Sequence, residues 1–167
     1  MRQKMESSAA NINKRKSEVA LLSVISNTAL VILKITTGLM IGSVSVISEA
    51  VHSGVDLLAA LIAFLAVKVA GKPADENHHF GHNKVENISG VVEALLIFLA
   101  AGWILFEAYR KLMDPEPIDS PGWGVAVMLI SSGANIFVSQ RLFCVGKETD
   151  SVALQADAWH LRTDIYT

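Results

Sequence analysis

The uncharged stretch at residues 120–140, SPGWGVAVMLISSGANIFVSQ, decides the fold class. As a helix rising about 1.5 Å per residue, it is long enough to cross a hydrocarbon core about 30 Å thick. The whole chain is similar in composition, with 51% hydrophobic and 18% charged residues. We predict four complete spans, over residues 19–40, 46–69, 87–112 and 121–144, and a fifth that starts near residue 152 and is cut off at residue 167. The sequence therefore predicts an all-α, polytopic transmembrane helix bundle.

The composition excludes several other classes of protein. A net charge of −2 leaves no basic face, so we expect a lipid bilayer and no nucleic acid as partner. A single cysteine, Cys144, excludes a disulfide scaffold. Membrane di-iron enzymes need more than the five histidines present and use an H-x-x-H-H box, which this sequence lacks. We therefore expect a protein that is not an enzyme.

Basic residues are divided unevenly between the two sides of the predicted bundle. Five lie in the polar segment 1–16, and five more lie near or beyond the C-terminal ends of spans two and four. The opposite side holds only Arg110 and Lys111. The positive-inside rule then places the N-terminus in the cytosol. We divide the chain into a cytosolic tail, residues 1–16, and a partial membrane domain, residues 17–167.

Two predicted spans carry the same pattern, a histidine followed four residues later by an aspartate. The pairs are His52 with Asp56 and His160 with Asp164. Positions i and i+4 share a helix face, so each pair can grip one cation. Two such pairs on facing helices supply the tetrahedral nitrogen and oxygen set that suits Zn²⁺. The same ligands also accept Co²⁺, Cd²⁺, Mn²⁺, Fe²⁺ or Ni²⁺.

A single pair of this kind is equally consistent with an internal salt bridge that steadies the bundle. Ionisable groups at membrane depth are costly and are functional by default. Two identical pairs on two spans therefore favour a metal site over a structural role.

A second candidate metal site lies in the predicted cytosolic loop. Asp75, His78 and His82 have spacings of three and four, so one short turn can present all three to one ion. The alternative is a solvated polar loop.

Four of the other charged residues within the predicted spans are interpreted one by one. Lys34 is expected to pair with an acid or to extend to the interface, without a site role, and Glu49 to lie beside the metal pair or face solvent at the far mouth. Glu93 is interpreted as an interhelical hydrogen-bonding group, with a proton relay as the alternative. Asp157 is expected to line a cytosolic vestibule.

Five short segments stand in a characteristic order along the chain. They are GSVS at 42–45, EAVHSGVD at 49–56, KPAD at 72–75, HFGHNKVE at 79–86 and ADAWHLRTD at 156–164. Together they resemble the cation diffusion facilitators, a family of divalent-metal transporters, over residues 17–167. The resemblance implies a transport site at His52, Asp56, His160 and Asp164, and a cytosolic site at Asp75, His78 and His82.

The same resemblance implies an architecture and an activity. Family members have six spans, a ferredoxin-like cytosolic C-terminal domain and usually a homodimeric assembly, whereas this sequence stops inside the fifth predicted span. They exchange metal for protons, and a histidine at the position of His52 goes with a preference for zinc. We therefore expect zinc efflux from the cytosol by zinc/proton antiport. The alternatives are a non-transporting membrane metal-binding or assembly subunit, an inactive fragment of the transporter, or a plain structural bundle.

Overall fold

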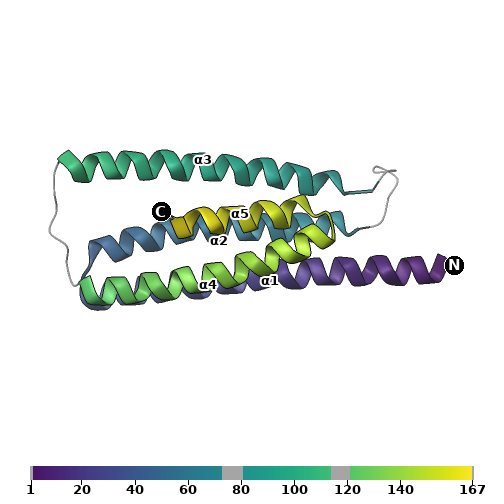
Figure 1. Cartoon of the computed structure of the whole chain (residues 1–167), viewed down its shortest axis with the longest axis horizontal. Helices are drawn as coiled ribbons and strands as arrows, with labels where there is room; N and C mark the ends of the chain where they lie inside the picture. The colour runs from purple at the N-terminus through teal and green to yellow at the C-terminus, as the bar shows by residue number, and fades with distance from the viewer. Residues whose placement is uncertain (1, 73–80, 114–120, 167) are drawn as a thin grey trace.

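The computed structural model describes residues 2–72, 81–113 and 121–166, and these parts contain helices and no strand. The helices, shown in Figure 1, are α1 (Arg2–Ile41), α2 (Val44–Ala70), α3 (Lys84–Met113), α4 (Pro121–Glu148) and α5 (Val152–Tyr166). In the described parts, α1 to α4 are long and apolar enough to cross a membrane. The predicted all-α bundle is confirmed, including the four long spans and the start of the fifth helix at Val152.

Helix α1 begins well before the predicted first span, and the apolar candidate span within it runs from Ala10 to Ile41. Three polar side chains bind this segment to the ends of other helices. The Asn13 side-chain amide donates to the Gly71 carbonyl over 3.4 Å, and Arg15 and Lys16 form ion pairs with Glu148 and Glu86 at 2.7 and 2.9 Å. The division of the chain at residue 17 stays a prediction, because α1 passes through that position without a break.

Small residues allow the helices to approach closely. Helix α2 contacts α1, α3 and α5, and its buried face includes the alanines at positions 59, 60, 63 and 66. Small side chains are typical of tight helix packing in membranes. Helix α5 in turn packs against α2, α3 and α4, and this packing brings His160 and Asp164 into contact with α2. Figure 1 shows α5 running alongside α2 between α3 and α4.

Two glycines have a direct role in this geometry. Gly42 has φ +66° in the tight turn between α1 and α2, a conformation that glycine adopts without strain. Gly90 lies where α3 meets α5, and a Cβ atom there would be 2.9 Å from Cγ1 of Val152. The turn places α1 beside α2, and the second glycine allows α3 to cover α5.

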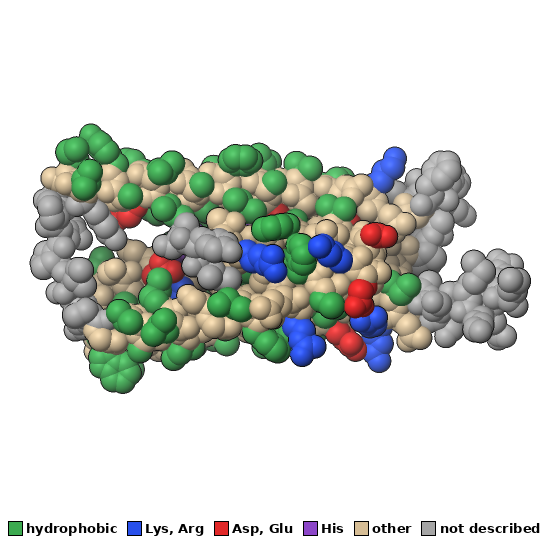
Figure 2. Space-filling model, viewed as in Figure 1, with side chains coloured by type: hydrophobic (Ala, Val, Ile, Leu, Met, Phe, Trp, Pro, Cys, Tyr) green, Lys and Arg blue, Asp and Glu red, His purple; other side chains and the backbone are tan. Residues whose placement is uncertain are grey.

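The outer surface is apolar along the helices. Large hydrophobic side chains stay exposed on α3, among them Phe98 (77%) and Leu105 (72%). On the face in Figure 2, hydrophobic side chains extend along the length of α3, while most of the visible charges lie over the half that holds the N-terminus. An apolar surface of this kind is suited to lipid, so the chain is an integral, multi-pass membrane protein.

Candidate metal site

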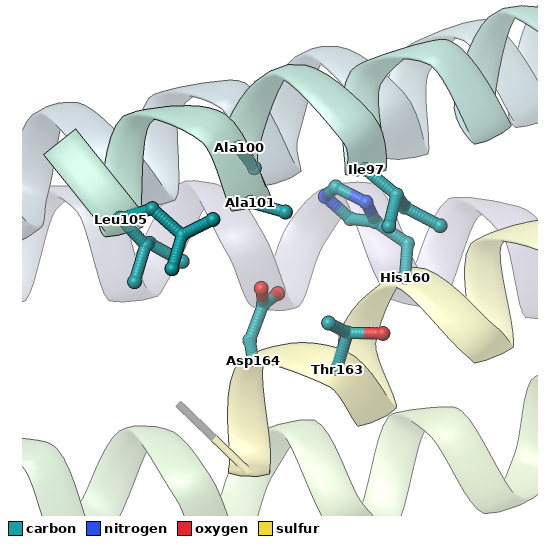
Figure 3. Close-up of a pocket in the computed structure, with 8 residues that line it drawn as sticks. Ile97, Ala100, Ala101, Leu105, His160, Thr163 and Asp164 are labelled. Atoms are coloured by element: carbon teal, nitrogen blue, oxygen red, sulfur yellow. The ribbon is translucent and has the colours of Figure 1, made fainter.

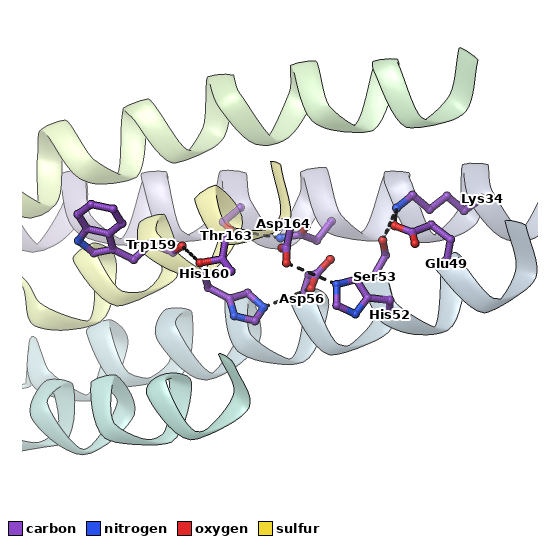
Figure 4. Close-up of polar contacts among 11 residues, drawn as sticks. Lys34, Glu49, His52, Ser53, Asp56, Trp159, His160, Thr163 and Asp164 are labelled. Atoms are coloured by element: carbon purple, nitrogen blue, oxygen red, sulfur yellow. Dashed lines mark hydrogen bonds and ion pairs between the residues drawn. The ribbon is translucent and has the colours of Figure 1, made fainter. Parts of the chain in front are cut away.

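The two histidine–aspartate motifs meet in space, and the pairing crosses between helices. His52 Nε2 of α2 lies 3.4 Å from Asp164 Oδ1 of α5. His160 Nε2 of α5 lies 3.2 Å from Asp56 Oδ1 of α2. Each histidine thus contacts the aspartate of the other helix (Figure 4). The four residues predicted from the sequence form one cluster between α2 and α5.

The distances within this cluster fit a small divalent cation. A tetrahedral ion with bonds of about 2.0 Å holds its ligand atoms about 3.3 Å apart. Both crossed pairs are close to that separation. Ligand atoms of His52, Asp56 and Asp164 all lie within 4.8 Å of one another. A modest contraction of this group would bring three ligands onto one ion, with His160 beside them.

The two crossed pairs differ in how exposed their side chains are. The His160 and Asp56 side chains are 1% and 4% exposed, whereas His52 and Asp164 are 17% and 11% exposed. His160 is covered by α3, and together with Asp164 it borders a cavity of about 260 Å³ whose other walls are mostly apolar side chains of α3 (Figure 3). His160 therefore faces a largely apolar region.

The other side of the cluster is polar. Here His52, Asp56 and Asp164 border a narrow chamber whose remaining walls come from α1, α2 and α4, at Lys34, Glu49, Met128, Ser131, Ser132 and Asn135. Sequence reasoning did not single out the polar residues of α4. The sequence pattern that could have revealed them is the polar group at positions 131, 132 and 135. Ser131 and Asn135 are four positions apart and so share one face of the helix.

Lys34 is paired with an acid, which is one of the two arrangements expected for it. Its ammonium group donates to Glu49 Oε1 over 2.9 Å and to the Ser53 hydroxyl over 2.7 Å (Figure 4). Glu49 lies beside the metal cluster, which is one of the two positions expected for it. Its side chain is 31% exposed. The contact with Ser53 was not foreseen.

Glu93 and Asp157 are two further acids in the interior, and both are fully buried. No hydrogen bond reaches the Glu93 carboxylate oxygens from the residues that the structure describes. The interhelical hydrogen bond predicted for Glu93 is therefore absent there. Asp157 is 0% exposed, so the vestibule predicted beside it is not open in the described parts of the chain.

The predicted loop site is described only in part. Asp75 and His78 lie outside the described residues. His82 precedes α3, and its backbone carbonyl accepts from the amide of Val85. Close by in sequence, Glu86 joins three helices, because it pairs with Lys16 of α1 and accepts a hydrogen bond from the Ser151 hydroxyl ahead of α5. This network was not predicted.

Comparison with known protein families decides the classification, because residues 20–167 match the cation efflux transmembrane domain. The chain belongs to the cation efflux family. The resemblance drawn from the five sequence segments is therefore confirmed.

Individual relatives agree with this membership. The chain is 38% identical to an uncharacterized transporter of Synechocystis over 148 residues, which are 89% of this chain and 48% of that protein. It is 33% identical to the cation-efflux pump FieF of Yersinia enterocolitica over 87% of this chain and 49% of that protein. The FieF pump of Klebsiella pneumoniae is 32% identical, with 89% and 50% covered. The chain spans about half the length of the curated relatives it matches.

Proposed function

We propose that this domain exports a divalent cation, most readily Zn²⁺, from the cytosol in exchange for protons. The observation that carries the proposal is the crossed pairing of His52 with Asp164 and of His160 with Asp56. A site built from two helices can be opened and closed by moving one helix against the other. Rocking of helices around a midplane site is the general scheme of alternating access.

Proton coupling follows from the chemistry of the ligands. A histidine must be neutral and an aspartate ionised before either can bind the metal, so protons compete with the cation. Free histidine has a pKa of about 6.5, which places this competition near physiological pH. A site that loads zinc at cytosolic pH would release it to a more acidic compartment. Similarity to pumps named for cation efflux supports this direction of transport.

The remaining features of the proposal come from sequence patterns. The excess of basic residues at the N-terminal end supports a cytosolic N-terminus. Asp75, His78 and His82 stay a candidate cytosolic metal site, and a homodimer stays the expected assembly of the family. The division into a tail at 1–16 and a membrane domain at 17–167 is proposed on the same basis.

Zinc flux into proteoliposomes under an imposed pH gradient tests this function. We expect proton-driven uptake by the unmodified chain and none by Asp56→Ala, because Asp56 is the acid shared between the ligand group and His160. Glu18→Ala is the matched control, since it removes an acid whose side chain is 62% exposed on α1. The same assay with Co²⁺, Cd²⁺, Mn²⁺, Fe²⁺ and Ni²⁺ ranks the cations.

Two outcomes would contradict parts of the proposal. Flux that ignores the pH gradient would remove the antiport step. Zinc binding that depends on Asp56, without flux, would leave the alternative of a metal-binding or assembly subunit.

A further inference from the structure

The polar chamber beside the metal cluster has features that the ligands alone do not explain. Its volume is about 20 Å³, which is room for about one water molecule. Ser131 on its wall is 5% exposed, and no residue of the described parts makes a hydrogen bond to its hydroxyl. A buried hydroxyl of this kind usually binds water or an ion. The chamber is therefore suited to bind a water molecule or an ion beside the Ser131 hydroxyl.

Lys34 is the unusual group in this chamber. It stands about two turns before the end of α1, is 4% exposed, and carries a charge beside a site for cations. Its ammonium group is bound to Glu49 at 2.9 Å and to Ser53 at 2.7 Å. A charged amine inside a membrane bundle is expensive unless it is paired, and it marks a functional role. Lys34 is thus held by contacts from α2, one of the two ligand helices.

The charges that line the chamber add up to a specific value. Three carboxylates line it, those of Glu49, Asp56 and Asp164, together with the single ammonium group of Lys34. With neutral histidines and ionised acids, which metal binding requires, the net charge is −2. One divalent cation neutralises that charge. The ion pair with Lys34 also occupies Glu49 Oε1, which would otherwise be available as a further oxygen ligand.

We propose that the Lys34–Glu49 pair sets the charge of the metal chamber so that it accepts one divalent cation and releases it again. This inference rests on the proposed function, and it assigns a specificity role to two residues outside the ligand set. Lys34 withholds Glu49 from the metal, and Glu49 keeps the ammonium group from repelling the metal. Each residue alone would unbalance the chamber, whereas the pair leaves it at −2.

Neutral substitutions give opposite expectations for the two residues. Lys34→Gln leaves a net charge of −3 and frees Glu49, so zinc should bind about tenfold or more tightly and leave more slowly. Glu49→Gln leaves −1, so zinc affinity should fall about tenfold or more. Lys34→Gln combined with Glu49→Gln restores −2, and affinity and flux should return to within about threefold of the unmodified chain. Lys34→Arg retains the charge and should bind zinc normally.

Equilibrium zinc affinity and zinc flux, measured on the same proteoliposome preparations, test this pattern. The matched control is the exposed pair Lys14 and Glu18 of α1, whose side chains are 74% and 62% exposed. Neutralising either or both should leave affinity and flux unchanged. Single variants of Lys34 and Glu49 with unaltered affinity would overturn the inference. A double variant whose zinc affinity is as far from that of the unmodified chain as the more strongly altered single variant would also overturn it. One residue would then act without the other.

Failure of the inference is distinguishable from failure of the proposed function. Zinc flux by the unmodified chain without the expected pattern among variants would remove only the charge-setting role. Binding that follows the pattern, without flux, would remove only the transport activity. A chain that binds no zinc would overturn both. Lys34→Arg separates charge from folding, because a variant that keeps the charge yet loses affinity would indicate a packing role.

Discussion

The two crossed contacts, His52 with Asp164 and His160 with Asp56, combine the same residue types but differ in their surroundings. The His160 and Asp56 side chains are almost fully buried and α3 covers the histidine, whereas His52 and Asp164 are partly exposed; of the four residues, only His160 does not border the polar chamber. Three of the four residues place ligand atoms within 4.8 Å of one another, and His160 stands outside that group. We propose that the residues bordering the chamber exchange the cation, and that the contact of His160 with Asp56 also holds α5 against α2.

The largest effect is expected from His52→Ala, which removes a ligand from the chamber side. Zinc affinity should fall more than about 100-fold, because changes in outer-shell partners alone cost about 10–100-fold. Without metal, the free energy of unfolding should fall by less than it does in His160→Ala, since the His52 and Asp164 side chains are more exposed than the His160 and Asp56 side chains. Competition with a chelator measures the affinity, and unfolding in detergent micelles measures the stability.

If His52→Ala unfolded the metal-free chain, the proposed difference between the two pairs would be contradicted. In that case the pair of His52 with Asp164 would also be a structural element. Glu18→Ala serves as the control for an unrelated change on the surface.

A smaller effect, on stability, is expected from His160→Ala. This change leaves the Asp56 carboxylate buried without the nitrogen that contacts it at 3.2 Å. An unsatisfied buried polar group costs about 1–3 kcal/mol, and more when it is charged. The metal-free variant should therefore lose about 1–3 kcal/mol in the free energy of unfolding, clearly more than His52→Ala loses.

The free energy of unfolding of the metal-free variants also tests whether the difference in burial between the two pairs affects stability. Equal losses from His52→Ala and His160→Ala would show that the exposure difference has no energetic consequence. His160→Ala with Asp56→Ala should recover part of the loss, because the buried charge is gone.

The sequence was sufficient for the spans and for picking out four residues that cluster between α2 and α5, because both depend on local patterns, whereas their role as ligands stays a prediction. A helix needs a run of apolar residues, and a shared face needs a spacing of four. The crossed pairing was not predictable, since it depends on how α5 is seated against α2. The contact of Lys34 with Ser53 has the same origin, because 19 positions separate the two residues and only the turn at Gly42 brings them together.

The smallest effect is expected at Gly90, where α3 meets the start of α5. In Gly90→Ala the new Cβ would lie 2.9 Å from Val152 Cγ1, and the β-branched valine has little freedom to turn away. Overpacking of this kind costs about 1–3 kcal/mol, and the better helix propensity of alanine offsets about 1 kcal/mol. We expect a net loss of about 1 kcal/mol, measured by unfolding of the metal-free chain.

Gly102→Ala is the matched control on the same helix, because nothing lies within 4 Å of its added Cβ. It should gain up to about 1 kcal/mol from helix propensity. Gly90→Ala with Val152→Ala removes the clash and should behave like the control. A loss that persists in this double variant would place the strain elsewhere in α3. Zinc affinity should change less than in His52→Ala, since moving α3 disturbs the covered side of the cluster and leaves the chamber side in place.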